Sequence, residues 1–195
     1  AVVAQTRKTA FVVATAMDNE FTVNGKVVKN KITMSTGEKT AHCTLTCKYN
    51  DGDTIEVKKY VAVLSSTNHP VEKMASKAMA SAGEAAGKGF DAMLESHIKA
   101  WAAKWEMGDI VIRGDIAAQQ GIRFNIFQLN QTYTGEDPRL NIGPKGFTGE
   151  KYGGSTYWDT EAFVLPFYLS TADTHVARNL LLYRYKHLEK AIENA

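Results

Sequence analysis

The chain has 195 residues, of which 44% are hydrophobic and 23% charged, as is typical of a globular protein of one large or two small domains. Its net charge of +2 is small, and no Lys/Arg-rich run is interleaved with aromatic residues, so we expect no nucleic-acid partner. No apolar stretch approaches the ~20 residues that a membrane span needs, so we expect no membrane partner either.

Residues 1–64 are predicted to form about five β-strands joined by tight turns. Apolar and polar residues alternate along residues 41–49 and 54–64, and Asn24-Gly25 between two short apolar runs is a strong signal for a hairpin turn. These strands amount to one antiparallel sheet or part of a sandwich, with little to cover its inner face. We therefore expect the chain to start within a β domain of a longer protein.

The two cysteines, Cys43 and Cys47, lie on the same side of the alternating segment. Four residues of extended chain separate them by about 13 Å, which is too far for a disulfide. His42 falls on the other side of the strand, which argues against a metal site. We predict buried free thiols, which suit a reducing compartment, and hence a cytoplasmic protein.

From Pro70 onward the hydrophobic pattern changes to the period of a helix. Residues 71–86 are Ala-rich and predicted to be helical. A second, amphipathic helix of about eighteen residues follows, and its apolar side carries Phe90, Leu94, Ile98, Trp101 and Trp105. We interpret the two Trp residues as packing residues and expect His97, on the same side, to be buried.

Asp115 is predicted to cap a helix that runs to about Thr134. This helix is apolar over much of its circumference, so its polar residues are expected to face protein, either as structural ties or as the wall of a polar pocket. These residues are Gln120, Arg123, Asn125 and Gln128.

Two further helices are predicted near the C-terminus. The first starts near Trp158, with Pro166 in its first two turns or at a kink. Asp173 is expected to cap the second. Apolar helices joined by loops, with a polar cluster at a loop-to-helix junction, are typical of one sector of a helical barrel.

The run of residues 143–161 is the most informative stretch of the chain. Five glycines fall within residues 143–154, and the cluster Tyr157-Trp158-Asp159-Thr160-Glu161 follows. A flat indole face beside a carboxylate is what a sugar ring needs, because its C–H face stacks on the ring and its hydroxyls donate to the carboxylate. A glycine-rich loop leading into an ordinary helix with a buried Trp is the alternative.

Four segments of the chain resemble glycoside hydrolase family 65: residues 121–129, 137–154, 157–163 and 177–185. The resemblance implies a β-sandwich, a helical linker and an (α/α)6-barrel catalytic domain. It divides this α+β chain into residues 1–66, the C-terminal part of the sandwich, residues 67–114, the linker, and residues 115–195, the start of the barrel. The chain is then expected to be an internal fragment of a longer enzyme.

The resemblance also implies a reaction. Members cleave α-glucosidic disaccharides, among them maltose, trehalose, kojibiose and nigerose, with inorganic phosphate and with inversion at the anomeric carbon. Thr148, Lys151 and Gly154 before Trp158 favour a member that acts on maltose. Phosphate is a co-substrate in this scheme, and no metal or other cofactor is implied.

By the same resemblance, Trp158 packs on the donor glucose and Asp159 accepts hydrogen bonds from its hydroxyls. Glu161 and Tyr152 are further candidates for sugar binding. Glu161 also has a simpler interpretation, as a first-turn carboxylate favoured by the helix dipole, and Glu150 with Lys151 as an exposed loop pair. The family's general acid lies downstream of residue 195, so no catalytic residue is assigned within this chain and the isolated chain is expected to be inactive.

Other functions stay open. One is that of another member of the same family, either a phosphorylase of trehalose, kojibiose or nigerose, or a hydrolase of α,α-trehalose or another disaccharide. The remaining alternative is a non-catalytic carbohydrate-binding β domain with a helical extension. A partial sandwich with a partial barrel exposes broad apolar surfaces, so we expect a homodimer.

Overall fold

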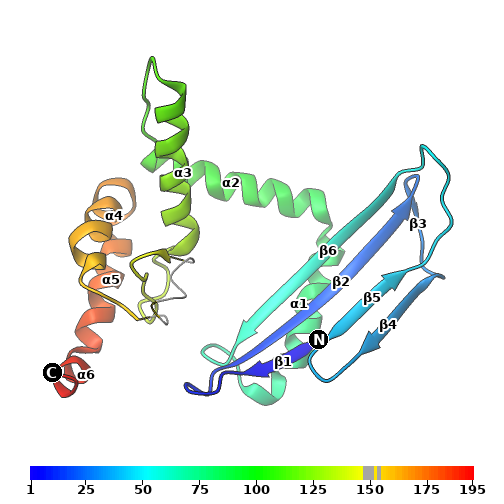
Figure 1. Cartoon of the computed structure of the whole chain (residues 1–195), viewed down its shortest axis with the longest axis horizontal. Coiled ribbons are helices and arrows are strands. Elements are labelled where there is room, and N and C mark those ends of the chain that lie inside the picture. The colour runs from blue at the N-terminus through cyan, green and yellow to red at the C-terminus, as the bar shows by residue number, and fades with distance from the viewer. Residues whose placement is uncertain (147–151, 153–154) are drawn as a thin grey trace. The chain divides into compact units, whose positions relative to one another are not determined.

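A computed structural model describes residues 1–146, 152 and 155–195 of the chain. These residues form two compact units, residues 1–97 and 98–195. The first unit contains the β-strands and the first helix, and the second contains most of the later helices (Figure 1). The three-part division expected from the sequence, 1–66, 67–114 and 115–195, stays a prediction.

The first unit is built on β2, the central strand of a four-stranded antiparallel sheet. Strands β1 and β3 pair with the two ends of β2, while β6 pairs with it from Val13 to Val23. Strands β4 and β5 form a separate antiparallel pair. The strands are β1 (Val2–Gln5), β2 (Val12–Val23), β3 (Lys26–Val27), β4 (Ile32–Thr36), β5 (Ala41–Leu45) and β6 (Ile55–Ser65).

The predicted Asn24-Gly25 hairpin is confirmed. Both residues have positive φ, 51° and 74°, as a tight hairpin turn requires. The Asn24 side chain donates to the Asp53 carboxylate at 2.8 Å and accepts from the backbone N–H of Thr54 at 2.9 Å. The turn is thereby tied to the loop before β6, which holds the register of β2 and β6.

The alternation predicted for residues 41–49 is confirmed in burial. Ala41, Cys43 and Leu45 are half-buried, whereas His42 is exposed. The strand itself ends at Leu45. Cys43 and Cys47 are free thiols, as predicted, but they are half-buried rather than fully buried.

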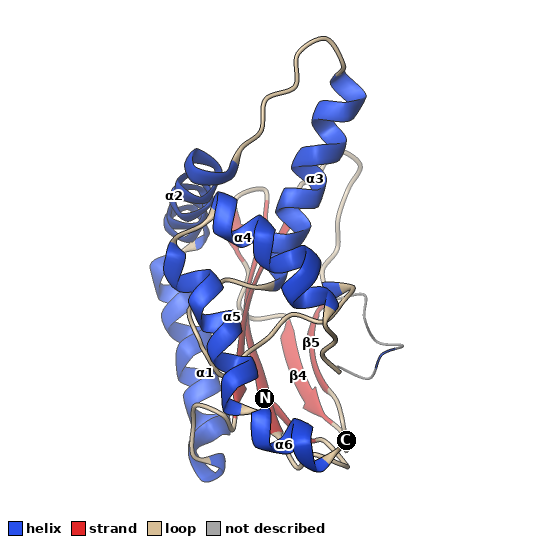
Figure 2. Cartoon of the chain, turned by 90° about the vertical axis from the view of Figure 1, so that its left-hand side faces the viewer, coloured by secondary structure: helices blue, strands red, loops and turns tan. Residues whose placement is uncertain are grey.

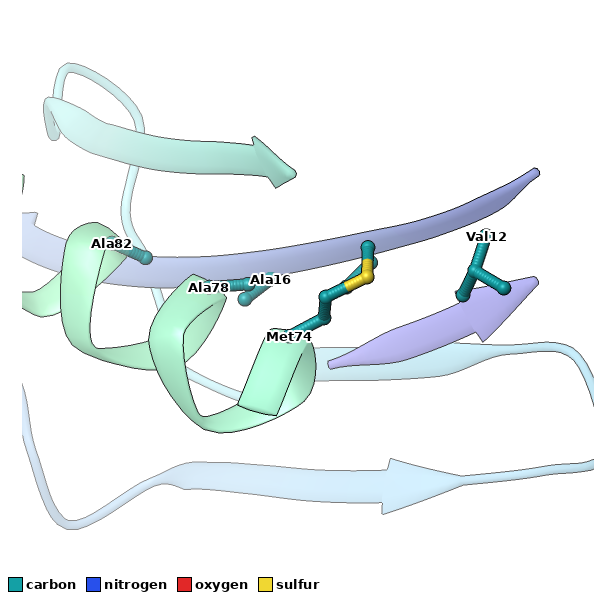
Figure 3. Packing of buried hydrophobic residues seen from close by; sticks show 6 residues of the cluster. Val12, Ala16, Met74, Ala78 and Ala82 are labelled. Carbon is teal, nitrogen blue, oxygen red and sulfur yellow. The ribbon is translucent and has the colours of Figure 1, made fainter. Parts of the chain in front are cut away.

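Helix α1 (Val71–Lys88) packs against one face of the four-stranded sheet. Its fully buried residues Met74, Ala78 and Ala82 recur every four positions, so they form one stripe along the helix. Figure 3 shows Ala78 facing Ala16 of β2, with Met74 extending across the strand. The expectation that little covers this sheet is therefore wrong for this face, because small side chains on both surfaces let helix and strand approach closely.

The second unit contains five helices and a π-helical turn among the residues that the structure describes. They are α2 (Phe90–Gly108), which begins in the first unit, α3 (Ile116–Thr132), η2 (Thr160–Val164), α4 (Leu165–Thr171), α5 (Thr174–Lys186) and α6 (Leu188–Glu193). Helices α4 and α5 lie side by side (Figure 2). These two helices contribute to the core of the second unit, which consists of Tyr133, Ile142, Tyr168, Val176 and Leu180.

Packing of the Trp residues on α2 is confirmed. Trp101 contacts Phe127 of α3, with ring centroids 5.0 Å apart, and Trp105, with centroids 6.3 Å apart. His97 is exposed, so the prediction that it is buried is wrong. His97 lies within residues 91–100 of α2, all of which are exposed, whereas Trp101 is half-buried.

The cap of α3 is confirmed, because the Asp115 carboxylate accepts from the N–H of Ala118 at 2.9 Å. Arg123 is a structural tie, with Nε donating to Asp109 at 2.8 Å. Gln120 and Asn125 are exposed, so the expectation that they face protein is wrong within the described residues.

Candidate functional site

The candidate site lies where an irregular segment enters a widened helical turn. Residues 155–157 are irregular, Trp158 starts the turn and Asp159 occupies the N-cap position of η2. The N–H of Leu165 donates to the carbonyl of Thr160, which is the i→i−5 bond of a π-helix. Pro166 follows in the first turn of α4, as predicted. Because proline has no N–H to donate and crowds the carbonyl four residues earlier, it favours this widened turn.

Thr160 anchors the turn to the core of the second unit, and its side chain is fully buried. Its hydroxyl donates to the carbonyl of Ile142 at 2.8 Å. Ile142 belongs to the core of the second unit and comes just before the glycine-rich loop. This bond therefore fixes the start of the turn to the base of the loop.

Trp158 is 68% exposed, so it is not the buried Trp of an ordinary helix. Its ring contacts Phe163, one turn later, with centroids 5.7 Å apart. Its carbonyl accepts from the N–H groups of Glu161 and Ala162 at 3.1 and 3.0 Å. The backbone of Trp158 is thus held in the turn while a large part of the indole remains accessible to a flat apolar ligand.

Asp159 follows directly and is half-buried. Although it stands at the N-cap position, its side chain makes no capping hydrogen bond. The carboxylate therefore keeps acceptor capacity that a ligand hydroxyl can use.

Glu161 is paired with Arg184 of α5. The guanidinium donates from Nε to Oε1 at 2.7 Å and from Nη2 to Oε2 at 3.1 Å, and the two side chains are 31% and 33% exposed. Arg184 also donates from Nη1 to the hydroxyl of Thr156 at 3.0 Å and from Nη2 to the carbonyl of Tyr157. Both carboxylate oxygens of Glu161 are thus engaged within the protein.

Tyr152 is exposed and its ring meets the ring of Tyr157 edge-on, with centroids 5.6 Å apart. The ammonium of Lys145 lies 5.7 Å from the centre of the Tyr152 ring. The structure therefore brings Tyr152 next to the residue that precedes Trp158. Thr148, Glu150, Lys151 and Gly154, which the sequence also singled out, lie outside the described residues.

A separate cavity of about 220 Å³ lies in the second unit between α2, the end of α3 and the α4–α5 turn. Tyr133 lines it and is 4% exposed, and its hydroxyl has no hydrogen-bond partner in the described structure. Burial raises the pKa of Tyr133 to about 12, with a further contribution from the charge of Asp137.

Within the described part of the chain, no group of three or more His, Cys, Asp or Glu residues is placed to hold a metal ion. None of the helices in the same residues combines the length and the apolar character that crossing a bilayer requires.

Comparison with known proteins matches both parts of the chain to one family. Residues 1–104 match the N-terminal domain of glycosyl hydrolase family 65, and residues 123–195 match the central catalytic domain of that family. The chain belongs to glycosyl hydrolase family 65.

Two family 65 relatives and one solved structure illustrate the similarity. Maltose phosphorylase of Bacillus subtilis is 48% identical over 80% of this chain. Alpha,alpha-trehalose phosphorylase of Thermoanaerobacter brockii is 30% identical over the full chain. A structure titled "Putative kojibiose phosphorylase from human microbiome" is 27% identical, with a TM-score of 0.82 over 97% of this chain and 24% of that one.

The chain spans only 21% of the Bacillus relative and 24% of the Thermoanaerobacter relative. Membership of family 65 confirms the predicted fold class, an N-terminal antiparallel β part followed by helices that begin the helical barrel. It also confirms the predicted resemblance to the family.

The sequence identified the Trp158–Glu161 cluster but not the long-range contacts of Thr160 and Arg184 that support it. Thr160 and Arg184 reach the rest of the unit through partners 18 and 23 residues away. A signal for Arg184 was present, since it lies within one of the segments that resemble family 65. Nothing in the spacing of residues revealed its partner.

Proposed function

We propose that this chain is part of an inverting disaccharide phosphorylase that cleaves maltose with inorganic phosphate to glucose 1-phosphate and glucose. The observation that carries the proposal is the 48% identity to a maltose phosphorylase over 80% of the chain. A kojibiose and a trehalose phosphorylase match at similar identity but over less of the chain, 45% over 55% and 47% over 47%. Two residues of the π-helical turn support the proposal further. Trp158 is exposed and offers a stacking face, and the Asp159 carboxylate makes no capping hydrogen bond and can accept from the donor glucose.

In the proposed reaction, a carboxylic acid protonates the glycosidic oxygen as its bond to the anomeric carbon breaks, and a phosphate oxygen bonds to the opposite face of that carbon. Phosphate replaces the base-activated water of an inverting hydrolase. We assign no Asp or Glu of this chain to the acid. Trp158 and Asp159 are proposed to hold the donor ring, with Tyr152 close by.

Phosphorolysis of kojibiose or trehalose by the same site is the second candidate. It is favoured by the match of almost the whole chain to the structure titled as a kojibiose phosphorylase. Hydrolysis of a disaccharide is a third, because the family description is that of glycosyl hydrolases.

We further propose that the reaction requires no metal or organic cofactor and that the protein is a cytoplasmic homodimer. The free, half-buried thiols of Cys43 and Cys47 support a reducing compartment. A row of exposed apolar residues on β6 supports association of two copies of the protein through this strand. These residues are Val57, Val61 and Val63.

The test is glucose 1-phosphate release from maltose by a full-length protein that contains this segment, with and without phosphate. We expect release only with phosphate. Free glucose without phosphate would show a hydrolase. Turnover of kojibiose or trehalose in place of maltose would replace the proposed substrate and keep the reaction.

A further inference from the structure

Arg184 holds the candidate sugar site from both sides. Its guanidinium donates to Thr156 and Tyr157, which precede Trp158, and to both carboxylate oxygens of Glu161, two residues after Asp159. The two proposed sugar-binding residues therefore lie between the two groups of contacts of one side chain.

This arrangement requires an arginine. All three guanidinium nitrogens are used, and they reach acceptors on two different segments. An ammonium group is a single point charge and cannot present a planar fork to a carboxylate while it also reaches a hydroxyl and a carbonyl. A lysine at this position would keep the positive charge and lose most of the geometry.

Arg184 contacts a stretch of irregular backbone, because residues 155–157 lie between the glycine-rich loop and the π-helical turn. Residues 155–157 belong to no helix or strand in the described part of the chain, and Thr160 is the buried anchor on the other side of the site. Without Arg184, Thr156 and Tyr157, which precede Trp158, would lose their hydrogen bonds to its guanidinium. The directions of the indole and of the Asp159 carboxylate would then be less well defined.

We propose that Arg184 is a positioning residue, which orients Trp158 and Asp159 for the donor sugar, and that Glu161 acts through Arg184 rather than by contacting the sugar. This proposal rests on the proposed function, since it assigns Trp158 and Asp159 to the donor ring.

The test compares Arg184→Lys with Arg123→Lys in the full-length protein. Arg123 is a matched control, because it also forms a two-pronged pair, with Asp109 at 2.8 and 2.5 Å, but does not contact the site. We expect Arg184→Lys to raise KM for the disaccharide by on the order of 10-fold, with KM for phosphate unchanged, because small misplacements of binding groups are costly. Arg123→Lys should leave both constants unchanged.

Two further measurements separate positioning from a merely structural role. In the first, added guanidinium ion should partly restore the KM of Arg184→Ala for the disaccharide. In the second, Glu161→Gln should raise this KM, as Arg184→Lys does. A crystal structure of Arg184→Lys should show Trp158 displaced on an otherwise unchanged fold, a result that does not depend on turnover.

The proposal is overturned if Trp158 keeps its place in that structure, or if Arg184→Lys and Arg123→Lys change KM equally. Failure of the proposed function looks different, because the unmodified protein then releases no glucose 1-phosphate from any of the three disaccharides while the structural comparison still reports on Arg184.

Discussion

At the scale of the residue, Tyr133 and Tyr168, which are neighbours in the core of the second unit, differ in whether the hydroxyl is hydrogen-bonded. The Tyr168 hydroxyl donates to the carbonyl of Leu129 at 2.8 Å, whereas the Tyr133 hydroxyl is buried without a partner in the described structure. Their rings meet edge-on, with centroids 5.5 Å apart.

Substitution by Phe should therefore have opposite effects at these two positions. Tyr168→Phe is expected to lower the free energy of unfolding by about 0.5–1.5 kcal/mol, because it removes a made hydrogen bond. Tyr133→Phe is expected to raise it by up to about 1 kcal/mol, because it removes a buried group that has no partner. Denaturant unfolding of the two variants measures both changes. A loss of stability in Tyr133→Phe would contradict the expectation and show that its hydroxyl bonds a water molecule in the adjacent cavity.

Asp137 makes a pH-dependent contribution. Hydrogen bonds from the Arg139 side chain and backbone lower the pKa of Asp137 from its ordinary value of 3.8 to about 2. Because the folded pKa is the lower one, the stabilisation is fully present above about pH 4 and is lost as the pH falls through about 2. Asp137→Asn should therefore show a shallower fall of the unfolding midpoint between pH 4 and 2.

The measurement is thermal unfolding followed by circular dichroism across that pH range. Asp51→Asn, which removes an equal charge from an exposed turn, is the control and should keep the steepness of the unmodified protein. Equal slopes for Asp137→Asn and the unmodified protein would contradict the assignment.

At the scale of the element, helix α1 and the sheet are held together by one stripe of α1. Met74 is fully buried in this stripe, while Met79 on the same helix is 54% exposed. Met74→Ala leaves a cavity against β2 and is expected to cost about 2–5 kcal/mol of unfolding free energy. Met79→Ala, the matched control, should change it by less than about 0.5 kcal/mol. Chemical denaturation decides, and equal losses would show that α1 does not pack through the Met74 stripe.

Much of the secondary structure was predictable because its signals are local. The Asn24-Gly25 turn needs positive φ at two adjacent residues, the Asp115 cap needs one carboxylate three residues before its donor, and the Trp stripe of α2 follows the helical period. The π-turn at Thr160 was not predictable in the same way. It depends on Pro166 together with a buried bond to Ile142, 18 residues earlier.

At the scale of the whole molecule, the chain provides a proposed donor-sugar site but no assigned general acid. The control in the activity experiment is therefore the 195-residue chain alone. We expect it to release no glucose 1-phosphate from maltose under conditions where the full-length protein does. Detectable phosphorolysis by the 195-residue chain would show that one of its own carboxyl groups is the acid.

The sequence by itself determined the family, the order of a β part and a helical part, and the residues of the Trp158–Glu161 cluster, because these depend on residue identity and on spacings of a few positions. Only the tertiary structure decided that α1 covers the sheet, that His97 is exposed, and that Glu161 is bound by Arg184. Each of these depends on which surfaces meet across long stretches of chain. A periodic stripe shows that a helix has a buried face, but it does not show which surface covers that face.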